Sequence, residues 1–402
     1  MAAVKTFAKR VLRTLLLVTP DALVSRVVPR AQRYAPGEIP AVPAPPKTAV
    51  RLFIGPSNLA GQGWGWARSV ERYLPDVGAV AMSGPKERRF SFPADQRVPY
   101  FVYRWSPSWR RAQTRALTRN YTHVIVESAR PLFGDALGRN LLEELPRLRS
   151  RGVPVALVFH GSDIRLPSRH AANSPWSPFR EGLMELTPVL EASVRKTSAL
   201  IANLDLPVFV STPDLLLDLP TADWLPVVVD PEAWRTQRGP LSGHDLPIVA
   251  HAPSRAILKG SDLIDPILDR LEEEGLLRYR RVQGVPSQEM PGVYKDADIV
   301  IDQVRLGIYG VAACEAMAAG RIVVSHVSEQ VRDHVLAATG LALPIVETSP
   351  DELESTIRAI IANPADYRDT AAAGVEFVEA VHSGALSAEN LRGFLTSPST
   401  RG

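Results

Sequence analysis

From residue 50 onward, short apolar segments alternate with amphipathic stretches of helical length. Runs such as THVIVES from Thr122, VPVALVF from Val153 and DADIVIDQV from Asp296 have apolar centres rich in β-branched residues, as expected of strands buried on both faces. Strands of this kind belong to parallel sheets whose two faces are covered by helices. The sequence therefore predicts an α/β fold of doubly wound parallel sheets.

The alternation occurs in two blocks. The first also contains the apolar runs SALIANL from Ser198 and FVSTP from Phe209, and it ends with LPVVVDPEAW; a polar connector, RTQRGPLSGHD, follows. The second block restarts with LPIVAHAPS at Leu246 and continues through YRRVQGVP and GRIVVSHV. We therefore expect two Rossmann-like domains. Their predicted bounds are residues 50–235 and 246–378, with a C-terminal helix and tail at 379–402.

Residues 1–36 form a basic segment with seven Lys and Arg residues against one acid, Asp21. Its apolar residues recur at steps of three and four, which predicts a helix with one apolar stripe: Val4, Phe7, Val11, Leu15 and Val18. Such a helix suits an anionic membrane surface. A helix docked on the protein's own body or a solvated tail fits the pattern equally well. A Pro-rich linker at residues 37–49 should keep this segment apart.

The composition excludes several classes of protein. With 402 residues, 45% of them hydrophobic and 22% charged, the chain can build two globular domains. A net charge of +3, without a basic stripe interleaved with aromatic residues, argues against nucleic acid as a partner. The single cysteine, Cys314, excludes an internal disulfide and a Cys-based zinc site. No apolar run reaches the roughly 20 residues of a membrane span, so we expect a cytoplasmic protein, peripheral at the inner face of the membrane if residues 1–36 bind there.

Ligands of open parallel sheets bind at the carboxyl ends of the strands, and two loops of the first block lie there. In GPSNLAGQGWGWARSV, Gly61 and Gly63 allow close approach of a ligand, and Trp64 offers a face for a sugar or an acceptor. The glycine spacing is not that of a dinucleotide site. A simple tight turn is the alternative for the glycines, and interdomain packing is the alternative for Trp64. In FHGSDIRLPSRH, His160 and Asp163 offer polar contacts to substrate; alternatively, Ser162 or Asp163 caps a helix and His160 is structural.

Two loops of the second block suit a nucleotide. In HAPSRAILKGSDLI, the cations Arg255 and Lys259 suit a diphosphate, with a solvated basic turn as the alternative. In LGIYGVAACEAMAAGRIVVSH, the backbone of Gly307–Gly310 can face phosphate. Glu315 is the only acid of this apolar stretch, and burying its carboxylate requires a partner. A ribose diol would supply two hydrogen bonds; a nearby arginine is the alternative.

Together these four loops resemble glycosyltransferase family 4, the retaining nucleotide-sugar enzymes of GT-B fold, over most of residues 50 to 395. YGVAACEAMAAGRIVV looks like the family's signature helix, with Glu315 as the second acid of an E-x7-E motif. HAPSRAILKGSD is similar to its phosphate-binding segment and HGSDIR to its first-domain His loop.

The resemblance implies two domains facing across a cleft, the first on the acceptor side and the second binding the nucleotide sugar. Arg255 and Lys259 would neutralise the leaving diphosphate, Glu315 would hold the ribose, and His160 would contact the transferred sugar. No metal and no cofactor are implied. The expected reaction moves a hexose-type sugar from a UDP- or GDP-linked donor to a glycan or lipid-linked acceptor in cell-envelope synthesis.

One position departs from the family pattern. Gly307 stands where the motif has its first Glu, normally a contact to the donor sugar. That contact must come from Asp302 or from the backbone of Gly307, Ile308, Tyr309 and Gly310, or it is lost. Two alternatives follow: a non-catalytic GT-B protein that binds a nucleotide or a partner, and a GT-B sugar-nucleotide epimerase.

Overall fold

The structure is a computed structural model that describes residues 19–84, 92–180, 182–243 and 245–397. The predicted apolar stripe of residues 1–18 lies outside these ranges. The chain divides into two compact units. The first holds the residues up to His160, Leu200–Phe209 and the residues from Ala388; the second holds Gly161–Ala199 and Val210–Ser387. Residues 161–199 and 210–235, expected in the first domain, thus belong to the second unit.

The first sheet has seven strands in the order β3-β2-β1-β4-β5-β6-β7. β1 pairs in parallel with both β2 and β4, with Val50 opposite Val77 and Leu52 opposite His123. The strand order reverses between β1 and β4, which makes their carboxyl ends the switch point of this sheet. The strands are β1 (Val50–Gly55), β2 (Val77–Ser83), β3 (Gln96–Arg97), β4 (His123–Glu127), β5 (Val155–Phe159), β6 (Val208–Val210) and β7 (Asp223–Trp224).

The second sheet has five strands in the order β12-β11-β10-β8-β9, and every neighbouring pair is parallel. Its switch point lies between β8 and β10, where Ile299 is opposite Val249. The strands are β8 (Ile248–His251), β9 (Arg278–Arg281), β10 (Ile299–Ile301), β11 (Ile322–Ser325) and β12 (Val346–Glu347).

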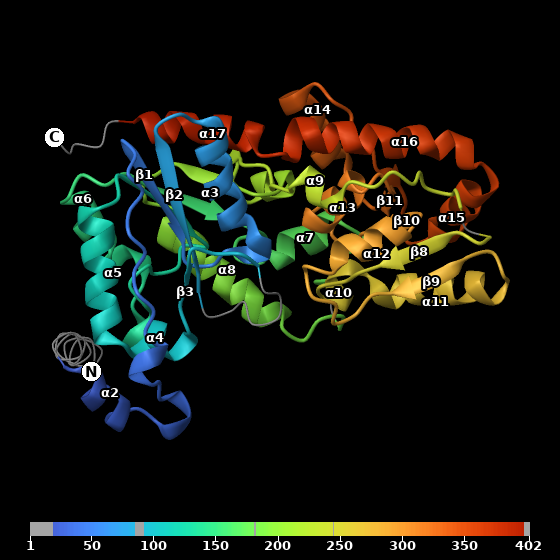
Figure 1. Cartoon of the computed structure of the whole chain (residues 1–402). Coiled ribbons are helices and arrows are strands. Elements are labelled where there is room, and N and C mark those ends of the chain that lie inside the picture. The colour runs from blue at the N-terminus through green and yellow to red at the C-terminus, as the bar shows by residue number, and fades with distance from the viewer. Residues whose placement is uncertain (1–18, 85–91, 181, 244, 398–402) are drawn as a thin grey trace. The chain divides into compact units, whose positions relative to one another are not determined.

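The three central strands of the second sheet, β8, β10 and β11, are buried on both faces, as their apolar runs predict, whereas the edge strands β9 and β12 are partly exposed. Val300 belongs to a core cluster with Cys314 and Met317, whereas its neighbours Ile299 and Ile301 belong to another cluster with helix α11 (Ser261–Glu273). Figure 1 shows α13 (Val311–Ala318) and α16 (Pro364–Phe377) on one side of this sheet and α11 on the other. Two layers of helices therefore enclose the sheet, as in a doubly wound fold.

Helices occupy most of the connections (Figure 1). They are α2 (Asp21–Val27), α3 (Gln62–Tyr73), α4 (Tyr100–Trp105), α5 (Pro107–Arg119), α6 (Leu145–Arg149), α7 (Pro167–Asn173), α8 (Thr187–Ile201), α9 (Pro231–Trp234), α10 (Ala256–Lys259), α11 (Ser261–Glu273), α12 (Met290–Asp296), α13 (Val311–Ala318), α14 (Glu329–Thr339), α15 (Leu353–Ala362), α16 (Pro364–Phe377) and α17 (Ala385–Thr396). The prediction of a strand at SALIANL is wrong, because Ser198–Ile201 continue the last turn of α8. A short apolar run alone does not separate a strand from a buried helix end.

The described part of the basic segment packs on the first unit. Val24 of α2 is fully buried. Asp21 accepts hydrogen bonds from the Tyr34 hydroxyl at 2.8 Å, the Ser106 hydroxyl at 2.5 Å and the Ser108 amide at 3.2 Å. The expectation that the linker keeps the segment apart is therefore wrong for residues 21–34, since the part-buried hydrogen bonds of Asp21 attach the segment to the start of α5.

Candidate functional site

The switch point of the second sheet brings together two of the predicted loops. β8 ends at His251, and its ring joins the neighbouring elements: Nδ1 donates to the Ile301 carbonyl of β10 at 2.9 Å, and Nε2 accepts from the Ser261 hydroxyl of α11 at 2.8 Å. Burial lowers the pKa of this imidazole, so it stays neutral at pH 7. A fully buried neutral ring thus fixes the strand ends on which the site is built.

Lys259 and Asp302 connect the two loops. The Lys259 ammonium donates to Asp302 Oδ1 and is 16% exposed, while the Asp302 side chain is almost completely buried. The Val304 amide also donates to the Lys259 carbonyl at 3.0 Å. Gly260 permits this approach, because its φ is +82° and a Cβ would lie 2.6 Å from Val304. Lys259 is therefore held at the strand ends with Asp302 as its counter-ion. Asp302 Oδ2 makes no hydrogen bond within the described ranges, and the contact of Asp302 to the donor sugar stays a prediction.

Glu315 lies in the second turn of α13 and is half-buried. Burial raises the pKa of its carboxyl to about 8, with a further upward contribution from Asp302 and an opposing one from Lys259. Within the described ranges its carboxylate makes no hydrogen bond or ion pair. The alternative of an arginine partner is thus not found there, and the group retains its capacity to accept hydrogen bonds from a ligand.

Gln303 gives the loop before α13 its shape. Its amide group donates to the Ile308 carbonyl at 2.6 Å, and its side-chain oxygen accepts from the Arg305 and Leu306 amides at 2.9 and 2.6 Å. The backbone turns at Gly307, whose φ is +66°. The loop is therefore preorganised in front of α13, where the first helical amides lack partners within the helix and favour an anion.

The other residues predicted to bind the donor lie in the loop before α13 and just before α10, and they differ in how exposed they are. Tyr309 points into the core, where its hydroxyl meets His382 Nε2 at 3.3 Å, so it can offer only backbone to a ligand. Ile308 and Gly310 are half-exposed. Arg255 precedes α10 and is exposed. The edge thus presents one exposed and one held cation, a preorganised backbone and a carboxyl group, which can bind a diphosphate joined to a diol.

The switch point of the first sheet is organised by a carboxylate that sequence reasoning missed. Glu127, the last residue of β4, is fully buried. It accepts hydrogen bonds from the Ser57 and Asn58 amides, each at 2.7 Å, and from His160 Nε2 at 3.1 Å. The ring of Trp66, also buried, stacks on His160 at 5.5 Å between centroids. His160 therefore has the structural partners of its alternative role, and its contact to substrate stays a prediction.

The glycine loop of the first sheet is also internally bonded. Glu127 takes the two amides that follow β1, and Asn58 Oδ1 accepts from the Trp64 amide at 2.9 Å. Gly61, at φ +74°, and Gly63 form the turn into α3. The Trp64 ring lies under the Arg68 guanidinium at 4.3 Å. Because a buried carboxylate already faces these amides, a phosphate there would meet its negative charge.

Asp163 accepts from the Gly161 amide at 2.7 Å and caps no helix, since α7 begins only at Pro167. The signal that would have found Glu127 is its position, an acid at the carboxyl end of an apolar strand. Among the residues that the structure describes, no group of three or more His, Cys, Asp or Glu side chains is placed to hold a metal ion.

Comparison with known proteins bears on the fold of the chain. No protein-family model and no curated protein sequence matches the chain. Solved structures do. Sucrose-phosphate synthase from Thermosynechococcus elongatus has a TM-score of 0.52 at 15% identity, over 85% of this chain and 97% of that one. HepE from Anabaena, in complex with UDP and glucose, has a TM-score of 0.54 at 13% identity, and the match covers 86% of this chain and 99% of HepE. A trehalose-6-phosphate synthase has a TM-score of 0.50 at 9% identity, and the match covers 86% of this chain and 98% of the synthase.

The chain has the GT-B fold. Its two parallel-sheet α/β halves, of seven and five strands, match these glycosyltransferase structures over nearly their whole length. The predicted fold class is therefore confirmed. Identities of 15% and below establish a shared fold and no shared activity.

Proposed function

We propose that the chain is a retaining, family 4-type glycosyltransferase that moves a sugar from a UDP- or GDP-linked donor to a glycan or lipid-linked acceptor. The observation that carries this proposal is the group at the switch point of the second sheet: Lys259, held against Asp302, and Glu315 on α13, whose carboxyl has no protein partner among the described residues. The HepE structures contain UDP, UDP with glucose, or UDP-glucose, which supports a nucleotide sugar as the donor.

In this function each group stabilises the departing nucleotide. Lys259, Arg255 and the amides at the start of α13 neutralise the charge that develops on the diphosphate as the sugar leaves. Lys259 is held by Asp302 and the loop backbone by Gln303, so these groups need little reorganisation. Glu315 accepts hydrogen bonds from the ribose diol, and His160 contacts the transferred sugar. The cations and amides do the work of a divalent ion, which makes the proposed reaction independent of metal and cofactor.

We place this activity in cell-envelope polysaccharide or glycoconjugate synthesis at the cytoplasmic face of a membrane. The support is the basic residues 1–36 together with the proposed acceptor class. No described helix is both long and apolar enough to cross a bilayer, so attachment would rest on the surface contact of that segment.

Two other functions use the same nucleotide site. Gly307, which replaces the acidic residue of the motif, favours a non-catalytic protein that binds the nucleotide or a partner transferase. An epimerase would change the sugar while it is still attached to the nucleotide.

Nucleotide release separates the three. The protein is incubated with a panel of UDP- and GDP-sugars, with and without glycan and lipid-linked acceptors, and free nucleotide and sugar are quantified. Transfer predicts acceptor-dependent release of UDP or GDP. Binding without release for every pair tried would favour the non-catalytic function, and an altered sugar formed without acceptor would favour the epimerase.

A further inference from the structure

Helices α5 and α6 of the first unit carry basic side chains and no acidic ones. α5 has four arginines in 13 residues, and α6 has two in five. Of these, Arg110 points inward, where its Nε donates to the Phe133 carbonyl at 2.7 Å, and the others are exposed. The two helices pack against each other (Figure 1). Their packing therefore brings several exposed cations together in the first unit.

Four of these exposed arginines have no partner for their guanidinium groups in the described part of the chain, and we call them the arginine face: Arg115 and Arg119 on α5, and Arg147 and Arg149 on α6. On α5, Arg111, Arg115 and Arg119 follow one another at steps of four residues. Like charges at this spacing lie on one side of a helix and repel each other. The arrangement therefore does not stabilise the fold, and an anionic partner would explain it.

The acids around α6 leave this charge largely uncompensated. Glu144 is buried and accepts from the Leu132 amide at 2.5 Å and the Phe133 amide at 3.0 Å. Glu143 and Asp205 are exposed, and within the described ranges neither forms an ion pair with the arginine face. The cations thus remain available to a ligand from outside.

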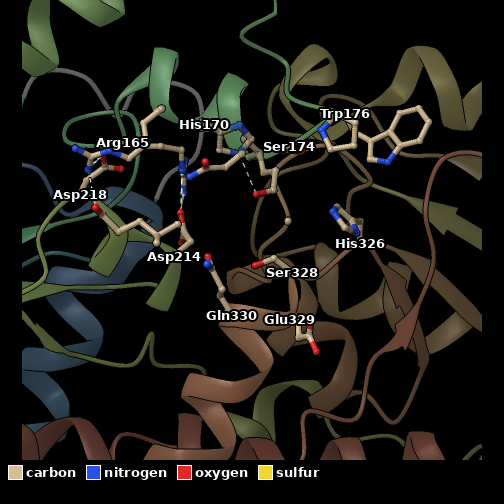
Figure 2. A pocket seen from close by; sticks show the side chains of 16 residues that line it. Arg165, His170, Ser174, Trp176, Asp214, Asp218, His326, Ser328, Glu329 and Gln330 are labelled. Carbon is tan, nitrogen blue, oxygen red and sulfur yellow. Dashed lines mark hydrogen bonds and ion pairs between the residues drawn. The ribbon is translucent and has the colours of Figure 1, made fainter.

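Arginines of the second unit show the more usual arrangement. Figure 2 shows Arg165 and Asp214 on the wall of a cavity, where they form an ion pair at 2.5 Å. Arg358 of α15 pairs with Glu274 at 2.7 Å and with Glu354 at 2.9 Å. The net charge of the whole chain is only +3, so the unpaired arginines of α5 and α6 are a local excess.

Exposed apolar side chains lie on a helix attached to α5. Leu23 and Val27 of α2 are 50% and 80% exposed and, being four residues apart, lie on one side of that helix. The exposed Arg26 stands between them in the sequence. Asp21, the first residue of α2, accepts from the Ser108 amide at the start of α5 at 3.2 Å. Large apolar side chains accompanied by cations are typical of helices that lie in a membrane interface. A nucleic acid or an acidic glycan would be bound by the charge and would leave these side chains in water.

We propose that the arginine face, together with Leu23 and Val27, docks the first unit on a bilayer that contains anionic phospholipid. Guanidinium groups stay charged and bind phosphate through paired hydrogen bonds, while the two apolar side chains enter the boundary between headgroups and acyl chains. This inference rests on the membrane placement in the proposed function, and it adds a folded surface beyond residues 1–36.

The test measures vesicle binding of the full chain. Arg115→Gln with Arg119→Gln, and separately Arg147→Gln with Arg149→Gln, are compared with wild type by sedimentation with mixed phosphatidylserine and phosphatidylcholine vesicles. We expect each pair of changes to lower the partition coefficient about tenfold, because each cation near an anionic bilayer adds to the binding free energy. All four side chains are exposed, so urea unfolding of these variants should match that of wild type.

Two further double variants separate the contributions. Leu23→Ser with Val27→Ser should lower the partition coefficient about threefold, through the loss of apolar contact with the bilayer. Lys196→Gln with Arg278→Gln is the matched control, because it removes the same charge from exposed positions of the second unit. We expect the control to bind within about twofold of wild type.

Unchanged binding in both arginine-face variants, or losses equal to that of the control, would overturn the inference. Binding of a DNA duplex that depends on the arginine face, without binding to vesicles, would also overturn it and identify nucleic acid as the partner. If wild type binds the mixed vesicles no better than pure phosphatidylcholine vesicles, the membrane placement fails together with the inference. The transferase activity is judged separately, by nucleotide release in solution with soluble glycan acceptors.

Discussion

Burial of Glu315 changes the pH at which its carboxyl group becomes charged. Burial and the nearby Asp302 carboxylate raise the pKa of Glu315 to about 8, from an ordinary value of 4.5. The folded protein therefore holds one more proton at this residue than the unfolded chain between about pH 4.5 and 8. Its free energy of unfolding falls as the pH rises through that range.

Glu315→Gln should remove this pH dependence. Relative to wild type, we expect the variant to gain roughly 2–4 kcal/mol in free energy of unfolding between pH 5 and pH 8.5. Urea unfolding at the two pH values measures the gain, and Glu289→Gln, at an exposed acid of the same unit, is the control. Parallel pH profiles for wild type and Glu315→Gln would contradict the predicted burial of this carboxyl.

Lys259 compensates a buried charge, so its removal should cost stability as well as diphosphate binding. Lys259→Ala leaves Asp302 buried without a counter-ion, and we expect a loss of roughly 3 kcal/mol in free energy of unfolding. Lys259→Ala combined with Asp302→Asn should recover more than half of that loss and still fail to bind UDP or GDP. Urea unfolding and calorimetry check both statements. A double variant no more stable than the single one would show that the pair is not coupled.

The sequence was sufficient to predict which residues lie at the carboxyl ends of strands. It did not predict which residues they form hydrogen bonds with. The rule that ligands meet the carboxyl ends of strands brings Lys259 and Glu315 to one edge, because each follows a recognisable strand. Glu127 binds amides 69 and 70 residues earlier, and His326 pairs with Glu347 across neighbouring strands. Hydrogen bonds of this kind depend on strand register, which the apolar pattern does not specify in detail.

At the scale of elements, the loop from Asp302 to Gly310 depends on one side chain. Gln303→Ala removes the acceptor of the Arg305 and Leu306 amides and the donor to the Ile308 carbonyl. We expect a loss of roughly 1–3 kcal/mol in stability and faster hydrogen exchange at residues 305 and 306. Gln283→Ala, at an exposed glutamine of the same unit, is the control. Exchange at 305 and 306 unchanged from wild type would contradict this account of the loop.

The basic N-terminal segment gives a second prediction at this scale. Residues 21–34 are attached through Asp21 and Val24, so deletion of residues 1–18 alone leaves that attachment in place. We expect the deletion to reduce sedimentation with phosphatidylserine vesicles severalfold, since it removes four of the seven cations and the whole apolar stripe. Neutral phosphatidylcholine vesicles are the control. Equal sedimentation of both proteins would leave only the docked or solvated alternatives for this segment.

At the scale of the whole molecule, the sequence predicted the fold class correctly but not how the chain divides into compact units. Alternating apolar runs and amphipathic stretches were sufficient for two doubly wound sheets, because that pattern follows from burial of both sheet faces. The same pattern did not predict the bounds of the two compact units, because the chain crosses from one unit to the other after His160, Ala199, Phe209 and Ser387. Only long-range contacts determine where loops such as residues 161–199 pack.

The central claim is that the edge formed by Lys259, Gly307–Gly310 and Glu315 binds the nucleotide of a sugar donor. Hydrogen–deuterium exchange of the wild-type chain, with and without UDP, UDP-glucose, GDP or GDP-mannose, tests it without requiring an acceptor. We predict that at least one of these ligands slows exchange in peptides covering residues 252–260 and 302–315. No protection with any of the four, or protection confined to residues 55–70 of the first sheet, would contradict the claim.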